Sequence, residues 1–497
     1  MIESFLGCGK PSSVAKNDKR RAGRYSSAVM ERDSSLQAFR ARRARIAADM
    51  LGAGGGVAIV PTAPERQRNS DNDHPYRHGS DFHYLTGFGE PGAWLIIGAD
   101  GRSTLLCRPK DAVRETWDGF RLGPEAAPAT LGVDEAFALD RLDEVMVARL
   151  GNQPAVWIPA GYPGLQGQLD GWLGRVRAKA RQGVEAPETQ HDLAPLLGEM
   201  RLFKDAGEIA TMRGAAAISA GAHVRAMRFC AARFRGDANA GIPEYEIEAE
   251  LLHEFRRHGA EGPAYGSIVA AGANACVLHY VPGRAELKAG ELCLIDAGCE
   301  LDGYASDVTR TFPADGRFTP AQRELYDIVA AAQRAAVDAT RPGARQRDAH
   351  AAAVRVLAQG MLDTGLLDRA RVGDVDAAIE SSAYRAFYMH GTGHWIGRDV
   401  HDVGNYLSSD EAPVEQPDWQ LGGRVVKKPS RRLEPGMVVT LEPGLYVRPG
   451  EGVPERYWNI GVRIEDDAVV TAEGCELISR GAPVDAAEIE ELMRIAG

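Results

Sequence analysis

The 497-residue sequence lacks several features that define common classes of protein. No apolar run is long enough to cross a bilayer, so we do not expect a membrane protein. The seven cysteines are scattered without a C-x-x-C pair, which favours reduced thiols over a disulfide framework. A basic excess is also missing: the formal net charge of −11 argues against nucleic-acid or anionic-membrane partners. The chain begins without a basic leader and long apolar core, and we expect a cytoplasmic protein.

The length and the patterning of the chain indicate more than one domain. Residues 1–34 are rich in Ser, Lys and Arg, and we expect them to form a disordered tail. Between residues 35 and 195, short apolar runs such as GVAIVP, AWLIIGA, STLLCRP and AVWIPAG alternate with helical patterns, which predicts an α/β domain. A region containing Gly, Pro and Gln near 182–198 is expected to join this domain to the next.

Helices with apolar residues at helical spacing open the second domain, expected over residues 200–490. The pattern predicts helices over 205–230 and 243–260. A third helix is expected to begin after Thr319, with Gln322 closing a capping box. Strand-like runs lie between and after these helices.

Two aspartates stand where the sequence otherwise builds a core. The run LCLIDAG begins as an apolar strand and ends at Asp296, and Asp307 follows eleven residues later. Asp302-Gly303 between them is a strong signal for a two-residue hairpin turn. If that turn forms, Asp296 faces Thr309, and Asp307 is its diagonal neighbour on the same face, about 7–8 Å away at Cβ. Alone, each aspartate is adequately explained as a turn or cap residue. Together, two carboxylates in one small space favour a bound divalent cation.

Three later segments add imidazoles and two further carboxylates. The segment MHGTGHWIGRDVHD carries His390, His394 and His401 among glycines that let the backbone bend tightly. The segments VTLEPG and GVRIEDD place Glu442 and Glu465 at the ends of apolar strands. Each residue alone could be a satisfied core histidine or a turn-flanking glutamate. Because buried acids are costly unless they are paired or metal-bound, the whole pattern predicts a metal site.

The predicted ligand set contains four carboxylates, one imidazole and no thiolate: Asp296, Asp307, His394, Glu442 and Glu465. This set favours Mn²⁺, with Co²⁺ or Zn²⁺ able to substitute. A single structural zinc would more often use Cys and His in a closed tetrahedral site. Five ligands, several able to bridge, predict two ions about 3.5–4 Å apart that share a hydroxide nucleophile.

These segments resemble the pita-bread metallopeptidases, the family that contains methionine aminopeptidase, prolidase, creatinase and Xaa-Pro aminopeptidase. The order Asp, Asp, His, Glu, Glu matches that family's five metal ligands, and the resemblance covers about residues 200–490. The stretch IVPTAPERQRNSDNDHPYRHGSDFHYLTGFGEPGAW is similar to the N-terminal domain of the bacterial aminopeptidase P group. Two further stretches are similar to that group: YGSIVAAGANACVLHY and GLYVRPGEGVPERYWNIGVRIEDD. The resemblance implies an N-terminal α/β domain, a C-terminal pita-bread (creatinase/methionine aminopeptidase-like) catalytic domain, and a homo-oligomer, either dimer or tetramer.

The resemblance also implies an activity: metal-dependent release of the N-terminal residue from peptides with proline in second position, by a hydroxide bridging two metal ions. Glu442, besides being a ligand, is expected to take the proton from that water and later return it to the proline nitrogen. His279 and His401 are expected near the substrate, where they stabilise the oxyanion or shuttle protons. Three further residues are expected to bind substrate or support the ligands: His390, Arg463 and Tyr446.

Three alternatives stay open. A prolidase would share the metals and the fold but cleave only Xaa-Pro dipeptides, and only the N-terminal resemblance argues against it. A non-catalytic pita-bread scaffold that binds peptide or protein is disfavoured because all five ligand positions are filled. A creatinase-like C–N hydrolase is disfavoured because that branch does not use the dinuclear site. One departure from the family is a longer connection at residues 408–432, which would alter substrate access if it folds near the site.

Overall fold

The computed structural model describes residues 36–418 and 423–495. The tail expected at residues 1–34 therefore lies outside the described residues. The chain divides into two compact units, 1–197 and 198–497. None of the helices in the described part of the chain combines the length and the apolar character needed to cross a bilayer.

The N-terminal unit is built on a six-stranded mixed sheet in the order β6-β5-β4-β1-β7-β8. Strand β1 (Val57–Pro61) is buried throughout and pairs antiparallel with β4 (Trp94–Gly98) and parallel with β7 (Ala155–Ile158). Helices α5 (Leu142–Leu150) and α6 (Leu165–Arg177) contribute to the same apolar core as these strands. The remaining strands of the sheet are β5 (Ser103–Cys107), β6 (Glu135–Ala138) and β8 (Thr189–Asp192). The expected α/β architecture is confirmed, because all four apolar runs form strands of this sheet.

The region near 182–198, expected to join the two domains, contains regular structure as well as the boundary between the units at residues 197 and 198. Strand β8 pairs parallel with β7 and belongs to the sheet, and helix α7 (Ala194–Leu202) follows one residue after it. The sequence reading of this region as the connection between the domains therefore overlooked a strand. The strand was missed because its sequence, TQHD, is mostly exposed and lacks the apolar alternation that marks a half-buried strand.

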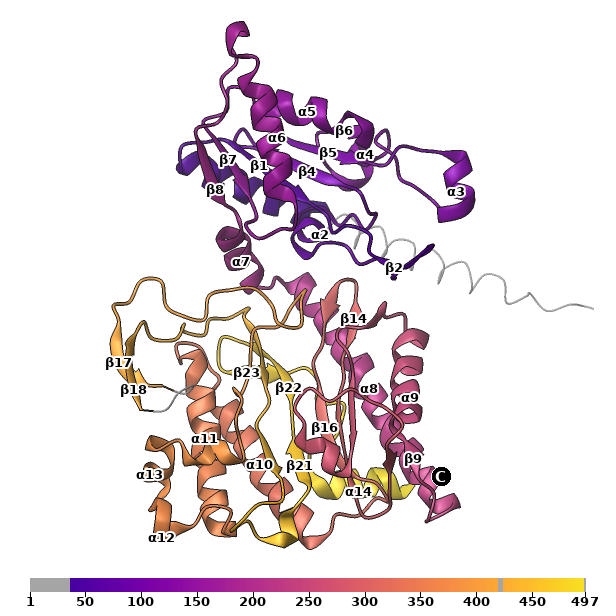
Figure 1. The fold of residues 1–497 in the computed structure, drawn as a ribbon, viewed down its shortest axis with the longest axis vertical. Helices are drawn as coiled ribbons and strands as arrows, with labels where there is room; N and C mark the ends of the chain where they lie inside the picture. Colours follow the sequence, from indigo (N-terminus) through magenta and orange to yellow (C-terminus); the bar gives the residue numbers. More distant parts are fainter. Residues whose placement is uncertain (1–35, 419–422, 496–497) are drawn as a thin grey trace, which may run out of the picture. The chain divides into compact units, whose positions relative to one another are not determined.

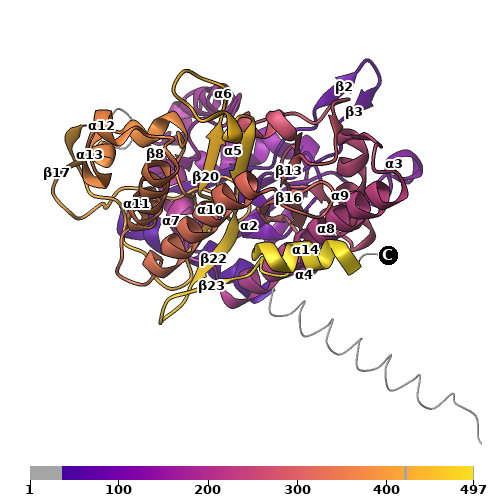
Figure 2. The ribbon, with the colours of Figure 1, turned by 90° about the horizontal axis from the view of Figure 1, so that it is seen from below.

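In the C-terminal unit, two helices followed by antiparallel strands occur twice along the chain. Helix α8 packs on α9, and α10 packs on α11, with the strands running between the two helix pairs (Figures 1 and 2). One apolar core contains residues of all four helices and of the strands. The elements of the first set are α8 (Ala206–Gly236), α9 (Glu244–Arg257), β11 (Ile268–Ala271), β13 (Leu292–Asp296) and β16 (Thr309–Pro313). Those of the second set are α10 (Pro320–Ala339), α11 (Gln346–Thr364), β19 (Val438–Leu441), β20 (Gly444–Val447), β21 (Ile460–Arg463) and β22 (Asp466–Val470), and α14 (Ala486–Ile495) ends the described chain.

Local sequence signals set the helices of this unit. Helix α8 covers the predicted stretch, and α9 buries Ile247, Leu251 and Phe255 along one face. Thr319 is the N-cap of helix α10: its hydroxyl accepts from the Gln322 backbone N–H, while the Gln322 side chain accepts from the Thr319 N–H. The predicted capping box is confirmed.

The hairpin that carries the two aspartates has the predicted register. Strand β13 pairs antiparallel with β16, and Asp296 faces Thr309. Asp302 and Gly303 both have positive φ, 49° and 73°, as a tight primed turn requires. The end of the hairpin, β14 (Cys299–Leu301) and β15 (Tyr304–Ala305), leaves the β13–β16 sheet and pairs with β10 (Gly262–Pro263).

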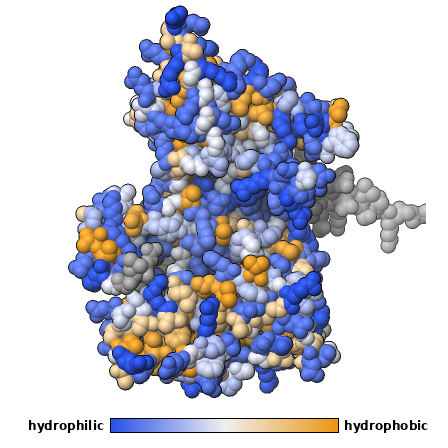
Figure 3. All heavy atoms as spheres, viewed as in Figure 1, coloured by the Kyte–Doolittle hydropathy of each residue, from blue (hydrophilic) through white to orange (hydrophobic). Residues whose placement is uncertain are grey.

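Exposed apolar side chains gather over two protruding segments (Figure 3). One is α3 (Ala112–Asp118) in the N-terminal unit, where Val113 and Trp117 are exposed. The other lies in the longer connection 408–432, which folds as the hairpin β17 (Val414–Pro417) and β18 (Arg424–Lys427). None of its described residues lines the cavity that holds the predicted ligands.

Gly298 tests the close packing inside the aspartate hairpin. A Cβ at this position would lie 1.7 Å from the carbonyl oxygen of Ser306. We expect Gly298→Ala to lower the free energy of unfolding by on the order of 1–3 kcal/mol, because the backbone must shift to relieve the overlap. Gly474→Ala is the matched control, since nothing lies within 4 Å of its Cβ and neither glycine has positive φ. Denaturant unfolding of the two variants measures the difference, and equal midpoints would contradict the packing described.

Candidate metal centre and active site

A cavity of about 610 Å³ in the C-terminal unit collects the predicted site residues. Its walls include apolar side chains such as Ile268, Leu278 and Val281 beside the polar groups. The predicted residues among its lining are His279, Asp296, Asp307, His390, His394, His401, Glu442, Arg463 and Glu465. Tyr446 does not line it, but its hydroxyl accepts from Arg463 at 3.0 Å and lies 2.8 Å from His390 Nε2. All the predicted site residues therefore lie in or against one cavity.

The two hairpin aspartates converge on a tyrosine that the sequence did not reveal. The hydroxyl of Tyr265 lies 2.6 Å from Asp296 Oδ1 and 2.5 Å from Asp307 Oδ1. This hydroxyl has one proton and can donate to only one carboxylate at a time. Burial raises the pKa of Asp296, with Arg463 opposing the shift and Asp307 adding to it. Tyr265 opens the stretch YGSIVAAG before β11, but nothing in that pattern distinguishes it from an ordinary core tyrosine.

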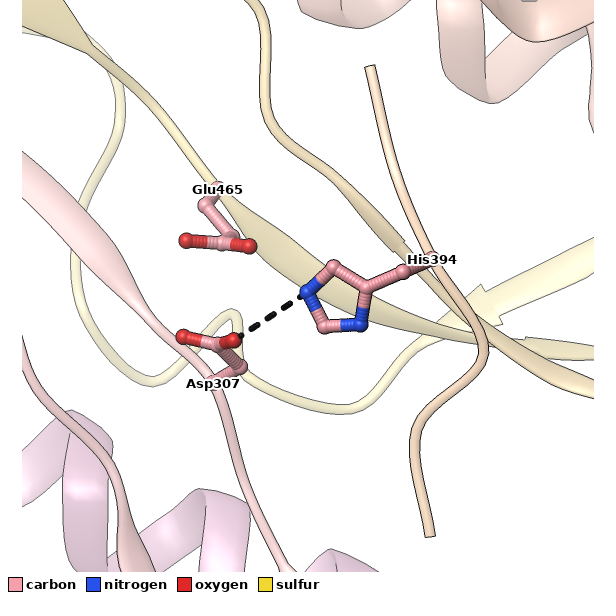
Figure 4. Close-up of side chains that lie close together, drawn as sticks. All are labelled: Asp307, His394 and Glu465. Atoms are coloured by element: carbon pink, nitrogen blue, oxygen red, sulfur yellow. Dashed lines mark ion pairs between the residues drawn. The ribbon is translucent and has the colours of Figure 1, made fainter. Parts of the chain in front are cut away.

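Three of the predicted ligands form a compact group with atoms of all three within 4.8 Å of one another: Asp307, His394 and Glu465. Their side chains point toward one another from three separate segments (Figure 4). His394 Nε2 lies 3.4 Å from Asp307 Oδ2 and 3.9 Å from Glu442 Oε1. Glu442 is therefore adjacent to this group, and Asp296 reaches it through Tyr265.

The segment that carries His394 runs beside strand β19 and fixes Glu442 at its end. The Glu442 N–H donates to the Thr392 carbonyl at 2.8 Å, and the Thr440 N–H donates to the His394 carbonyl at 2.9 Å. A Cβ on Gly393 would lie 1.9 Å from the Thr440 oxygen, so this approach requires glycine. Close packing thus accounts for Gly393, one of the glycines noted in the sequence.

Glu465 occupies the break between β21 and β22 and is held by groups that the sequence did not single out. The Thr309 hydroxyl donates to its carboxylate at 2.7 Å. Arg310, which is fully buried, donates to its carbonyl at 2.6 Å and to the Asp466 carboxylate at 2.7 Å. The register of the hairpin already placed Thr309 opposite Asp296, so its presence at the site was available from sequence. The partners of Arg310 were not.

The acids of this site are costly to ionise together without a cation. Burial raises the pKa of Glu442 to about 7, against the opposing charges of His394 and Arg463. Burial, reinforced by Asp307 and Glu442, holds the pKa of Glu465 well above its ordinary value. Burial alone would lower the pKa of His394, but Asp307 and Glu442 raise it to about 9. Crowded carboxylates with one imidazole are a donor set that suits divalent cations.

A second chain of contacts links the acids to the predicted substrate-binding residues. Arg463 donates to Asp296 Oδ2 at 2.6 Å and to the Tyr446 hydroxyl. His390 Nδ1 lies 3.7 Å from Glu442 Oε2. Burial is the main cause that lowers the pKa of His390 to about 3, and the positive charge of Arg463 adds to this shift. The imidazole is therefore neutral. On the other side of the site, the His401 ring stands edge-on to His394 with centroids 4.4 Å apart.

Each of the two units matches a known family model. Residues 210–472 match the model described as metallopeptidase family M24. The chain belongs to metallopeptidase family M24. Residues 39–157 match the aminopeptidase P N-terminal domain. The predicted combination of an N-terminal α/β domain with a pita-bread catalytic domain is confirmed, and so is the resemblance on which it rested.

Relatives of this M24 metallopeptidase match it over nearly its whole length. It is 42% identical to Xaa-Pro aminopeptidase of Escherichia coli strain K12 over 464 residues, 92% of this chain and 98% of that protein. Aminopeptidase PepP of Pseudomonas aeruginosa is 45% identical with a TM-score of 0.83, covering 92% of this chain and 98% of that one. Zinc-substituted E. coli aminopeptidase P in complex with product is 42% identical with a TM-score of 0.83, covering 93% and 99%. As an M24 metallopeptidase, the chain depends on a divalent metal.

The raised pKa of Glu442 predicts how stability varies with pH in metal-free protein. Its folded-state pKa of about 7 exceeds its ordinary value of 4.5, so its contribution to stability falls as pH rises between these values. We expect Glu442→Gln to be more stable than wild type at pH 8 by on the order of 1–3 kcal/mol, since one pKa unit corresponds to about 1.4 kcal/mol. The advantage should shrink toward pH 5. Denaturant unfolding in chelator at both pH values measures it; a pH-independent difference would contradict the assigned cause.

Proposed function

We propose that this chain is a metal-dependent Xaa-Pro aminopeptidase, which releases the N-terminal residue from peptides that have proline in second position. One observation carries the proposal: a single cavity brings four carboxylates and an imidazole together in a chain that matches Xaa-Pro aminopeptidase over 92% of its length. The substrates are peptides, and the bond cleaved is the one that precedes proline.

The proposed substrate explains why such a site is useful. The bond before proline is a tertiary amide without an N–H, so an enzyme cannot hold it through that donor. Two divalent ions, Mn²⁺ with Co²⁺ or Zn²⁺ as substitutes, would polarise the carbonyl and lower the pKa of water at the site. Asp296, Asp307, His394, Glu442 and Glu465 would hold them.

The other steps belong to side chains of the cavity. Glu442 takes the proton of the attacking water and returns it to the proline nitrogen as the bond breaks; its carboxylate lies in the cavity beside His394, within reach of the ligand group. His279 and His401 donate to the oxygen that gains negative charge. His390, Arg463 and Tyr446 orient the substrate and hold Asp296 and Glu442 in place.

Three finer points belong to this proposal and stay predictions. The number of ions is two, the assembly is a homo-oligomer, either dimer or tetramer, and the enzyme works in the cytoplasm. The number of ions follows from the ligand count, because five side chains, several able to bridge, exceed what one catalytic ion needs.

A peptide panel tests the function. With Mn²⁺, we expect cleavage of a tripeptide such as Arg-Pro-Pro, no cleavage when Ala replaces the second residue, and little cleavage of the dipeptide Gly-Pro. Chelation should stop the reaction and Mn²⁺ should restore it. The measurement is the amount of first residue released, which is quantified by chromatography. Cleavage of the dipeptide alone would indicate a prolidase, and a protein that retains no metal after Mn²⁺ supplementation would indicate a binding scaffold.

Replacement of Glu442 tests its role as proton carrier. Glu442→Gln with bound metal should reduce kcat by more than the 10–100-fold typical of residues that only support ligands, because the amide cannot accept the proton. Glu248→Gln is a matched control, since Glu248 lines the same cavity outside the ligand set. Metal content by elemental analysis accompanies the kinetics. A metal-loaded Glu442→Gln enzyme with close to full activity would show that the proton moves elsewhere.

A further inference from the structure

Behind the metal centre, a buried hydroxyl joins two aromatic side chains. Thr392 Oγ1 lies 2.8 Å from His350 Nδ1 on helix α11 and 2.6 Å from the hydroxyl of Tyr388. Thr392 is 3% exposed and Tyr388 is fully buried. A hydroxyl has one donor and two acceptor positions, so Thr392 can serve both partners at once. Burial, followed by the charges of Arg347 and Arg385, lowers the pKa of His350 to about 3, so the ring is neutral.

The backbone of Thr392 also contacts a residue of the candidate site. The Thr392 carbonyl accepts the N–H of Glu442, and two residues later His394 makes the next contacts with Thr440. Glu442 and His394 both depend on where this short segment lies. The ring of Tyr388 also stands edge-on to His390, with centroids 4.7 Å apart.

Helix α11 holds the neighbouring peptide as well. The side-chain amide of Gln346, at the start of the helix, donates to the Gly393 carbonyl at 3.2 Å. The preceding residue, Arg345, donates to the Ser430 carbonyl at 2.7 Å and to the Glu411 carboxylate, both within the longer connection 408–432. The start of α11 therefore contacts that connection on one side and the ligand segment on the other.

We propose that Thr392, held by His350 and Tyr388, is a positioning residue that fixes the backbone carrying His394 and the N–H contact of Glu442. Loss of the hydroxyl removes one buried hydrogen-bond partner from His350 Nδ1 and one from the Tyr388 hydroxyl, and this cost favours a shift of the segment that carries residue 392. A shift of this segment changes where the Glu442 carboxylate lies. The inference rests on the proposed function for its kinetic readout, but not for its metal-binding readout.

The test compares three variants. Thr392→Val removes the hydroxyl and keeps the shape, and Thr392→Ser keeps the hydroxyl and removes the methyl group. Thr340→Val is the control, because Thr340 and Thr392 both line a small second cavity beside His350, but the Thr340 hydroxyl donates to the Ala336 carbonyl in the last turn of α10. The measurements are kcat and KM on an Xaa-Pro tripeptide and the affinity of metal-free protein for Mn²⁺ by calorimetry.

We expect Thr392→Val to lower kcat about tenfold or more, with KM within about twofold, and to weaken Mn²⁺ binding severalfold, as is typical when a group supporting a ligand is removed. Thr392→Ser and Thr340→Val should stay near wild type. His350→Asn, whose amide can replace Nδ1, should be faster than His350→Leu. The double variant Thr392→Val/His350→Leu should be no slower than Thr392→Val, because the two substitutions remove the same His350–Thr392 contact.

Several outcomes overturn the inference. The positioning role fails if Thr392→Val matches Thr340→Val in both kcat and Mn²⁺ affinity, or if Thr392→Ser is as slow as Thr392→Val. If wild type cleaves no Xaa-Pro peptide, the proposed function fails and Mn²⁺ affinity alone decides the positioning role. If wild type is active and the variants do not differ, the positioning role fails and the proposed function stands.

Discussion

Mutual repulsion among buried carboxylates is the constraint on which this catalytic unit depends. Asp296, Asp307, Glu442 and Glu465 share one cavity with His394, and burial raises the pKa of three of the four acids. The pKa of Asp307 alone among the four is lowered: burial raises it, but the hydrogen bond and charge of His394 together with the hydrogen bond of Tyr265 outweigh burial. A fold bears such a cost only when something compensates for it, and a divalent cation does so while also making the groups useful.

The scaffold meets this constraint by placing each acid where regular structure stops. Asp296 ends β13, Glu442 follows β19, and Glu465 separates β21 from β22. At such positions the backbone is held by a sheet on one side, while the side chain is free to enter the cavity. Neutral or cationic neighbours, including Tyr265 and Arg463, then fix the carboxylate oxygens.

Much of this arrangement could be predicted because it is encoded locally. The Asp302-Gly303 turn fixed the register of Asp296 against Thr309, since side chains alternate with a period of two along a strand. The candidate ligands could be picked out because buried acids at the ends of apolar strands are costly unless they are paired or metal-bound. Tyr265 and the contacts of Arg310 were not predictable, because each depends on packing between segments far apart in the chain. Strand β8 was missed because an exposed edge strand carries no apolar alternation.

The hydrogen bonds of the buried Arg310 guanidinium determine when, during synthesis of the chain, the candidate metal centre can be completed. It joins the backbone at Glu465 to the carbonyl oxygens of Ala482 and Pro483, close to the end of the described chain. The first aspartates therefore leave the ribosome long before the groups that complete their surroundings. Until residues 465–483 have been synthesised, the growing polypeptide carries an unfinished centre and an arginine without these acceptors, so hydrolytic competence is acquired only after this segment has emerged.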